Sequence, residues 1–175
     1  MTYGIISDLH LHNWSAFSHV NVIGFNNRLT QILNEVKRAA EEVRECGGDT
    51  LYIAGDIFHV RGKITPSVLN PTTDCFRQIV EEMEMNVRAI PGNHDLENRD
   101  SDGLGNAIRA LEGAGVDVCD EITVFSEDSN KVVMVPWYSS IADLKEAIKR
   151  IGDTINPSQY DLIIHAPVDN VIFGI

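Results

Sequence analysis

The chain has 175 residues, of which 43% are hydrophobic and 23% are charged, and its formal net charge at pH 7 is -12. This length suits one domain with a substantial core, and the composition is that of an ordinary globular protein. Proteins that hold nucleic acid by their own surface are usually basic, so the acidic charge argues against tight autonomous binding of DNA. It does not exclude cleavage of a phosphodiester, because two bound divalent cations would add about four positive charges at a site.

The sequence shows no signal for a membrane or for an oxidising compartment. No apolar run approaches the roughly 20 residues that span a bilayer. Residues 1–8 lack the basic and apolar regions of a signal peptide. Cys46, Cys75 and Cys119 are widely spaced and form neither a zinc pattern nor a disulfide framework. We therefore expect a cytoplasmic protein with no membrane partner, whose thiols are reduced and packed.

Strands and helices are expected to alternate along the chain. Apolar side chains at helical spacing from Phe25 to Val43, followed by Gly47 and Gly48, predict the first helix and its end. Further helices are expected around residues 76–83, 104–111 and 141–151. Strands are expected at residues 3–7, 50–54, 86–90, 116–119, 122–125, 131–135 and 160–164, with a hairpin turn at 126–130. This order predicts an α/β fold with a mainly parallel sheet, to which the hairpin adds antiparallel strands.

Side chains that can bind metals follow four of the expected strands. These side chains are Asp8 and His10, Asp56 and His59, Asn93 and His94, and His165. Ligands of open α/β sheets bind at the carboxyl ends of the strands, so we expect the four groups to meet at one rim. Carboxylate, imidazole and amide groups together suit hard divalent cations.

The residue types predict a division of roles around two cations. The expected ligands are Asp8, His10, Asp56, Asn93 and His165. Asp8 and His10 are two residues apart and can point to the same side as the chain leaves a strand. Asp56, in the middle of the rim, is the expected bridging ligand. Cations held in this way would activate a shared water and clamp phosphate oxygens, which leaves His94 free to protonate the leaving oxygen.

Each of these motifs alone also has a purely structural explanation. Asp8 with His10 can form a capped turn, and residues 91–95 have the composition of a simple turn. His165 can be a core or capping histidine. Only the presence of all four motifs in register favours the metal site.

Several neighbouring side chains keep two explanations. Arg61 and Lys63 either contact a phosphate backbone or belong to a solvated loop. Trp14 and Phe17 either stack on bases or cover the rim of the site. His12 is either a further ligand or solvated.

Taken together, the motifs resemble one known family. Asp8-x-His10, Gly55-Asp56-x-x-His59, Gly92-Asn93-His94-Asp95 and His165 are similar in order and separation to the calcineurin-like metallophosphoesterases, from residue 4 to about residue 167. The resemblance implies a layered α/β fold with mixed β-sheets flanked by helices. It also implies that residues 1–175 form the N-terminal part of a single metallophosphoesterase domain.

The resemblance implies a role for each site residue. Asp8, His10 and Asp56 would bind one metal ion, and Asp56, Asn93 and His165 would bind the other. The ions would most often be manganese, with magnesium as an alternative. His94 would be the catalytic acid, and His59 would stand beside it and orient the phosphate without binding metal.

Within the family, the second and third motifs most resemble the exonuclease subunits of double-strand-break repair complexes, including bacteriophage versions. This implies a DNA substrate, an ATPase partner of the coiled-coil type, and the host cytoplasm if the protein is phage-encoded. The alternatives are a phosphoesterase acting on a small phosphodiester or a phosphoprotein, and a non-catalytic fragment. The protein phosphatases that resemble this family have an Asp-Arg pair where His59 and Val60 stand, which disfavours that branch.

The chain departs from the family pattern at its end. It contains no Gly-His-x-His segment after His165, so each metal ion would lack one imidazole. Water, a nearby residue or a second chain would have to supply the missing ligands. Residues 171–175 are mostly apolar, whereas chain ends are usually polar. We therefore expect a chain truncated at the C-terminus, or one half of a split protein.

Overall fold

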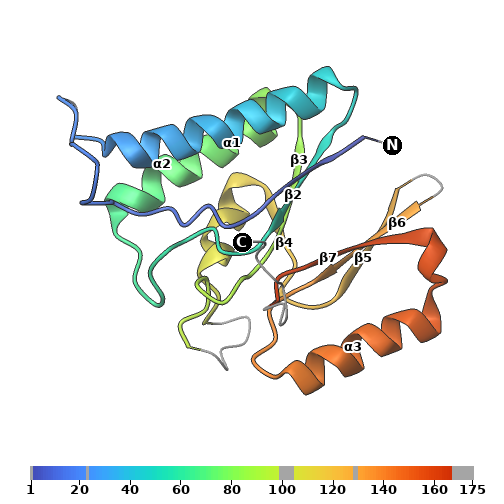
Figure 1. Ribbon diagram of the computed structural model, residues 1–175. Coiled ribbons are helices and arrows are strands. Elements are labelled where there is room, and N and C mark those ends of the chain that lie inside the picture. Colours follow the sequence, from blue (N-terminus) through green and yellow to red (C-terminus); the bar gives the residue numbers. More distant parts are fainter. Residues whose placement is uncertain (1, 23, 99–104, 128–129, 167–175) are drawn as a thin grey trace, which may run out of the picture.

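The computed structural model of the protein describes residues 2–22, 24–98, 105–127 and 130–166 (Figure 1). Its first sheet has four parallel strands in the order β1 (Gly4–Ile6), β2 (Thr50–Ala54), β3 (Asn86–Ile90) and β4 (Val116–Val118). Its second sheet consists of β5 (Thr123–Glu127), β6 (Asn130–Val135) and β7 (Tyr160–Ile164). β5 and β6 pair antiparallel, and β6 and β7 pair parallel. The predicted α/β fold with mixed sheets is confirmed.

Two details of the predicted strands are wrong. The last three strands form a sheet of their own, whereas the sequence pattern indicated that they extend the parallel sheet. The hairpin turn is also shorter than predicted, because β5 continues to Glu127 and β6 begins at Asn130. Pairing between distant strands leaves no local signal in the sequence, so the apolar pattern alone indicated one sheet, whereas the family resemblance implied more than one.

The helices begin and end where local chemistry directs them. α1 (Asn27–Glu45) begins after Asn26, whose side chain accepts hydrogen bonds from the backbone of Arg28 and Leu29, and ends before Gly47 with φ 78°. The other helical elements are α2 (Pro66–Arg77), the π-helical turn η1 (Gln78–Glu82), the 3-10 helices η3 (Ala107–Ala114) and η4 (Pro157–Gln159), and α3 (Ile141–Thr154). Leu104, where a helix was expected to begin, lies outside the described residues.

Four layers result from this order of elements (Figure 1). α1 and α2 cover one face of the first sheet, where Leu51 and Ile53 of β2 enter their core. Tyr52, between them on the same strand, faces the second sheet and packs in a cluster with Met134 of β6. Val133, next to Met134, faces α3 on the outer side. Both sheets are thus buried on both faces over these strands.

A hydrogen bond joins the first strand to the second sheet. The hydroxyl of Tyr3 donates to Oδ2 of Asp161 on β7 at 2.6 Å, and the Tyr3 ring packs edge-on against Tyr52 at 5.2 Å. Burial, followed by the bond to Asp161, raises the pKa of Tyr3 to about 12. The phenol therefore stays protonated in the folded protein at pH values where the unfolded chain ionises.

Tyr3→Phe is expected to lower the free energy of unfolding by about 1–2 kcal/mol at pH 7, because Asp161 loses a partly buried donor. Since the folded pKa is raised, this stabilisation is complete below about pH 10 and is lost as the pH rises to about 12. Urea denaturation at pH 7 and at several pH values above 9 measures both effects. Tyr138→Phe is the control, and an equal pH response of the two variants would contradict the assignment.

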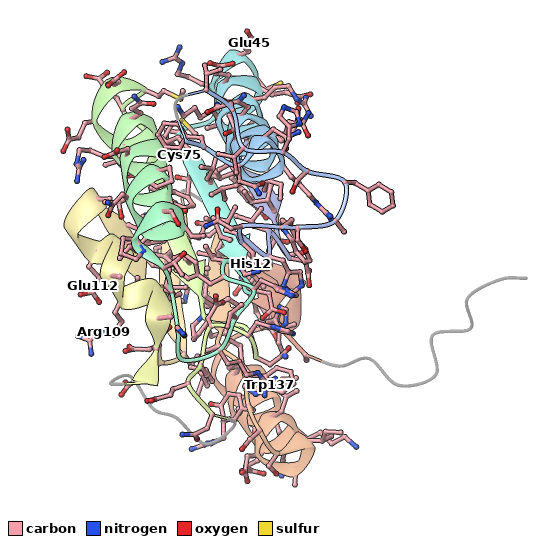
Figure 2. All side chains as sticks on the ribbon, turned by 90° about the vertical axis from the view of Figure 1, so that its left-hand side faces the viewer. His12, Glu45, Cys75, Arg109, Glu112 and Trp137 are labelled. Carbon is pink, nitrogen blue, oxygen red and sulfur yellow. The ribbon has the colours of Figure 1, made fainter. Side chains whose placement is uncertain are left out.

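The cysteines match expectation only in part. Cys75 and Cys119 are buried and reduced, and burial raises the pKa of Cys75 to about 11. Cys75 lies between α1 and α2 (Figure 2). The prediction of packing is wrong for Cys46, which is exposed at the end of α1.

Among the described residues, no helix has the length and apolar character required to cross a bilayer. The apolar end at residues 171–175 lies outside the described part of the chain.

Candidate metal centre

The four predicted motifs meet at one place between the two sheets. Asp8 and His10 follow β1, Asp56 follows β2, and Asn93 follows β3, all in the first sheet. His165 follows β7 and therefore reaches the site from the second sheet. The expected single rim of one sheet is thus a junction, where the carboxyl ends of strands from both sheets come together.

The loops after β1 and β2 run side by side beyond the ends of their strands. The backbone N–H groups of Asp8, His10 and Leu11 donate to the carbonyls of residues 55, 56 and 57 at 3.1, 2.9 and 2.8 Å. Asp8, His10 and Asp56 have φ values of 55°, 45° and 54°. Non-glycine residues in this left-handed region are strained, and such strain concentrates at functional sites. It persists here because the paired loops hold it in place.

Asp56 is the centre of the site. Its side chain is buried, and Oδ1 accepts a hydrogen bond from the backbone N–H of His94 at 2.8 Å. Oδ2 lies 3.7 Å from Nε2 of His10 and 3.5 Å from Nε2 of His165. Oδ1 of Asp56 therefore holds the backbone of the loop that carries His94, while Oδ2 lies between the imidazoles of His10 and His165.

One backbone carbonyl sets the orientation of His165. Its Nδ1 donates to the carbonyl of Ala54 at 2.8 Å, which leaves the lone pair on Nε2. Nε2 lies 3.3 Å from Oδ1 of Asn93. A Cβ atom on Gly55 would approach Nδ1 of His165 to 2.6 Å, and one on Gly92 would approach Oδ1 of Asp56 to 2.2 Å. Glycine at both positions allows this close packing.

The donor set fits divalent cations. The ligand atoms of Asp8, Asp56 and His165 all lie within 4.8 Å of one another, and Nε2 of His10 lies 3.9 Å from Asp8. Neighbouring ligands of an octahedral cation with bonds of 2.0–2.1 Å are separated by about 3 Å. The separations of 3.3 to 3.9 Å between these donors require only small movements to reach that value. The structure brings all five predicted ligands together, and their roles as ligands stay predictions.

The comparison with known families decides the membership of the chain. The model of the calcineurin-like phosphoesterase family matches residues 1–136. The chain belongs to this family. Its members hydrolyse phosphoester bonds, and the predicted resemblance is confirmed.

Individual relatives of the chain are more distant. The chain is 30% identical to the DNA double-strand break repair protein Mre11 of Methanopyrus kandleri over 118 residues. This match covers 63% of the chain and 22% of the Mre11 protein. Among solved structures, nuclease MPE of Pseudomonas putida matches with a TM-score of 0.49 and 20% identity. The match covers 75% of the present chain and 52% of the nuclease chain. A dimetal phosphatase of Danio rerio matches with a TM-score of 0.48 and 16% identity, and the match covers 90% of the present chain and 53% of the phosphatase chain. The chain thus spans about a fifth of the Mre11 relative and about half of the two solved chains.

A cluster of imidazoles adjoins the predicted metal ligands. Nδ1 of His94 donates to the backbone carbonyl of His59 at 2.7 Å, and the two rings stack at 5.6 Å with 14° between their planes. Nδ1 of His59 lies 3.5 Å from Nδ1 of His10. Burial, together with the positive charges that His10, His12 and His94 can carry, lowers the pKa of His59. The lowered pKa favours the neutral form of the His59 ring beside His94.

Asp95 is a residue of the site to which the sequence assigned no role. Its fully buried carboxylate accepts backbone N–H groups of Ile57 at 3.2 Å, Phe58 at 2.8 Å and Gly92 at 2.9 Å. Burial raises the pKa of Asp95 to about 6, against the lowering effect of these three donors. Asp95 thereby ties the loop after β2 to the loop after β3. An acid at the end of a polar turn reads as solvated, so only its burial reveals this function.

Asp95→Ala is expected to lower the free energy of unfolding by about 3 kcal/mol or more, because three buried donors lose their acceptor at 1–3 kcal/mol each. Asp153→Ala, which removes an exposed acid at the end of α3, is the matched control. Urea denaturation of both variants at pH 7 measures the difference. A loss of stability no larger than that of Asp153→Ala would show that Asp95 does not hold the loops.

The remaining candidates line the edges of the site. Trp14 packs against His59 with ring centroids 4.4 Å apart, and the Arg28 guanidinium lies over the Trp14 ring at 4.3 Å. This contact favours the prediction that Trp14 covers the rim. His12 lies beside both rings and belongs to neither group of potential ligands among the described residues. Phe17 is almost fully exposed on the loop before α1.

Proposed function

We propose that this phosphoesterase is a dinuclear-metal-dependent phosphodiester hydrolase that acts on DNA, as the exonuclease subunit of a recombination or repair complex. One observation carries the hydrolase assignment, namely the convergence of carboxylate, amide and imidazole donors on Asp56 beside an oriented His94. The similarity to a DNA double-strand break repair protein supports DNA as the substrate.

In this proposal the donors divide between two ions. Asp8, His10 and Asp56 would hold the first ion, and Asp56, Asn93 and His165 would hold the second, with manganese as the expected metal. Such ions supply an activated water and neutralise the charge that develops on a phosphate. The protein contributes the fixed orientation of the ligands, which the Ala54 carbonyl and the left-handed loop residues provide.

His94 donates a proton to the leaving oxygen of the phosphodiester. Because its Nδ1–H is occupied by the carbonyl of His59, the protonated ring presents its other N–H, at Nε2, to the substrate. Proton transfer from Nε2 to the leaving oxygen prevents the build-up of an alkoxide. The neutral ring of His59 stacks on His94 and limits its rotation, and it also offers a hydrogen bond to the phosphate.

The proposed partners follow from charge and from the family pattern. A chain with a net charge of -12 needs help to retain a polyanion, and an ATPase partner of the coiled-coil type would hold the DNA. The complex would act in the cytoplasm, or in the host cytoplasm for a bacteriophage protein.

The test is hydrolysis by the purified chain with and without manganese. Single-stranded and double-stranded DNA are compared with bis-p-nitrophenyl phosphate, and chelated samples serve as blanks. We expect manganese-dependent cleavage of DNA, and a His94→Ala preparation purified in the same way excludes a contaminating nuclease. Turnover of bis-p-nitrophenyl phosphate alone would indicate a small phosphodiester as the substrate. No turnover of any substrate would favour a non-catalytic fragment.

A further inference from the structure

A second pocket lies beside the histidine cluster and has no part in the proposed metal centre. It has a volume of about 250 Å³ and lies between the loop after β1, the loop after β2 and the start of α2. Leu11, Phe58, Ile64 and Val68 form its apolar walls, and His12 and Lys63 bring the polar atoms. The floor is rigid, because Leu11 and Phe58 are fully buried and their backbones pair in a β-bridge.

A row of rings connects the metal centre to this pocket. His94 lies next to Asp56, His59 stacks on His94, and the ring of His12 lies 5.4 Å from that of His59. His12 in turn lines the pocket. The metal centre has its own opening, which Asp8, Asn93 and His165 line together with Trp137. In Figure 2, His12 lies toward the layer of α1 and α2, and Trp137 lies toward α3.

We propose that the pocket receives the nucleobase on the leaving-group side of the scissile phosphate. This inference rests on the proposed function and adds a specificity subsite to it. The direction follows from His94, because the group that protonates the leaving oxygen must lie between the metal centre and the departing nucleoside. The pocket lies on that side of the centre.

The size and chemistry of the pocket fit one base. Pockets for drug-sized ligands measure about 300–1,000 Å³, so a volume of 250 Å³ suits one planar ring system and excludes a longer segment of DNA. The apolar walls favour the uncharged face of a base, and Phe58 is an aromatic side chain on which a base of any sequence can stack. Lys63 is exposed at the mouth, where its ammonium group can pair with the next phosphate along the strand.

The first experiment uses the dinucleotide thymidylyl-thymidine and its two analogues in which one base is replaced by hydrogen. The products identify the leaving nucleoside, since cleavage releases either a 5′- or a 3′-monophosphate. With manganese present, loss of the base on the leaving side is expected to lower kcat/KM about tenfold or more. Loss of the other base is expected to change it less than about twofold.

Ile64→Trp, which fills the pocket, tests the location. This variant is expected to cleave the intact dinucleotide and the leaving-side analogue at similar rates, so the ratio of the two rates falls toward one. Ile141→Trp places the same bulky side chain on an exposed position of α3 and is expected to keep the wild-type ratio. Thr65→Trp, at the exposed rim, is the second variant if Ile64→Trp does not fold.

A binding measurement separates this proposal from the proposed function. Saturation-transfer difference NMR with thymidine and the metal-free protein is expected to show transfer to the base with the wild type and with Ile141→Trp, and none with Ile64→Trp. An unchanged ratio in Ile64→Trp, or no transfer with the wild type, would overturn the base pocket. Transfer without hydrolysis of any phosphodiester would support base binding in the pocket and would overturn the proposed function.

Discussion

His94→Ala is expected to lower the rate of phosphodiester hydrolysis by about 10²- to 10⁴-fold, the usual contribution of a general acid. The loss should appear in kcat, because His94 acts on the leaving oxygen in the transition state. Metal binding should persist, since only the backbone N–H of His94 contacts Asp56 and alanine keeps that N–H.

Two measurements define this result. Steady-state kinetics with a phosphodiester gives kcat, and calorimetric titration with manganese gives the affinity for metal. His19→Ala, which removes an exposed histidine from the loop before α1, is the matched control. Activity of His94→Ala within a few-fold of the control would eliminate His94 as the acid, whatever the metal affinity.

The part of the fold that sequence patterns predict is the part that local chemistry decides. β2, β3 and β7 occur at their predicted bounds because each is a short run of apolar or β-favouring residues that ends at a motif. The end of α1 is likewise marked by the glycine at position 47. Such signals depend only on neighbours in the chain.

Two features differ from what the sequence pattern indicated, one for a local reason and one because of distant partners. α2 begins at Pro66, ten residues before the predicted helix, because Pro71 and several polar residues obscure the apolar periodicity of its first turns. The second sheet is separate because β6 turns alternate side chains toward the first sheet and toward α3. Neither outcome can be read from the short segment concerned.

In the candidate site, too, the sequence predicts some features and only the fold reveals the others. Asp8, Asp56 and Asn93 were identified because few other residue types suit a metal at the end of a strand. The carbonyls of Ala54 and His59, which orient two imidazoles, have no sequence signature, since every residue has a carbonyl. Residue identity therefore predicts which groups do the chemistry, and the fold determines what holds them.

Asp56→Asn is expected to abolish both metal binding and hydrolysis. Each ion would lose a shared carboxylate that supplies several kcal/mol of charge stabilisation, and at 1.36 kcal/mol per tenfold this corresponds to a rate loss of about 10³-fold or more. The amide oxygen of asparagine can still accept the N–H of His94, so the loop after β3 should keep its position. The variant thus removes charge with little change of shape.

The change in thermal stability with manganese distinguishes this effect from misfolding. Wild-type protein should unfold at a higher temperature when manganese is added, because a ligand that binds only the folded state stabilises it. Asp56→Asn should show no such shift, while its unfolding temperature without metal should not fall, since a buried negative charge has been removed. Asp153→Asn, an exposed acid on α3, should behave like the wild type. If Asp56→Asn retained the manganese shift, the metal centre would have to be built around other residues.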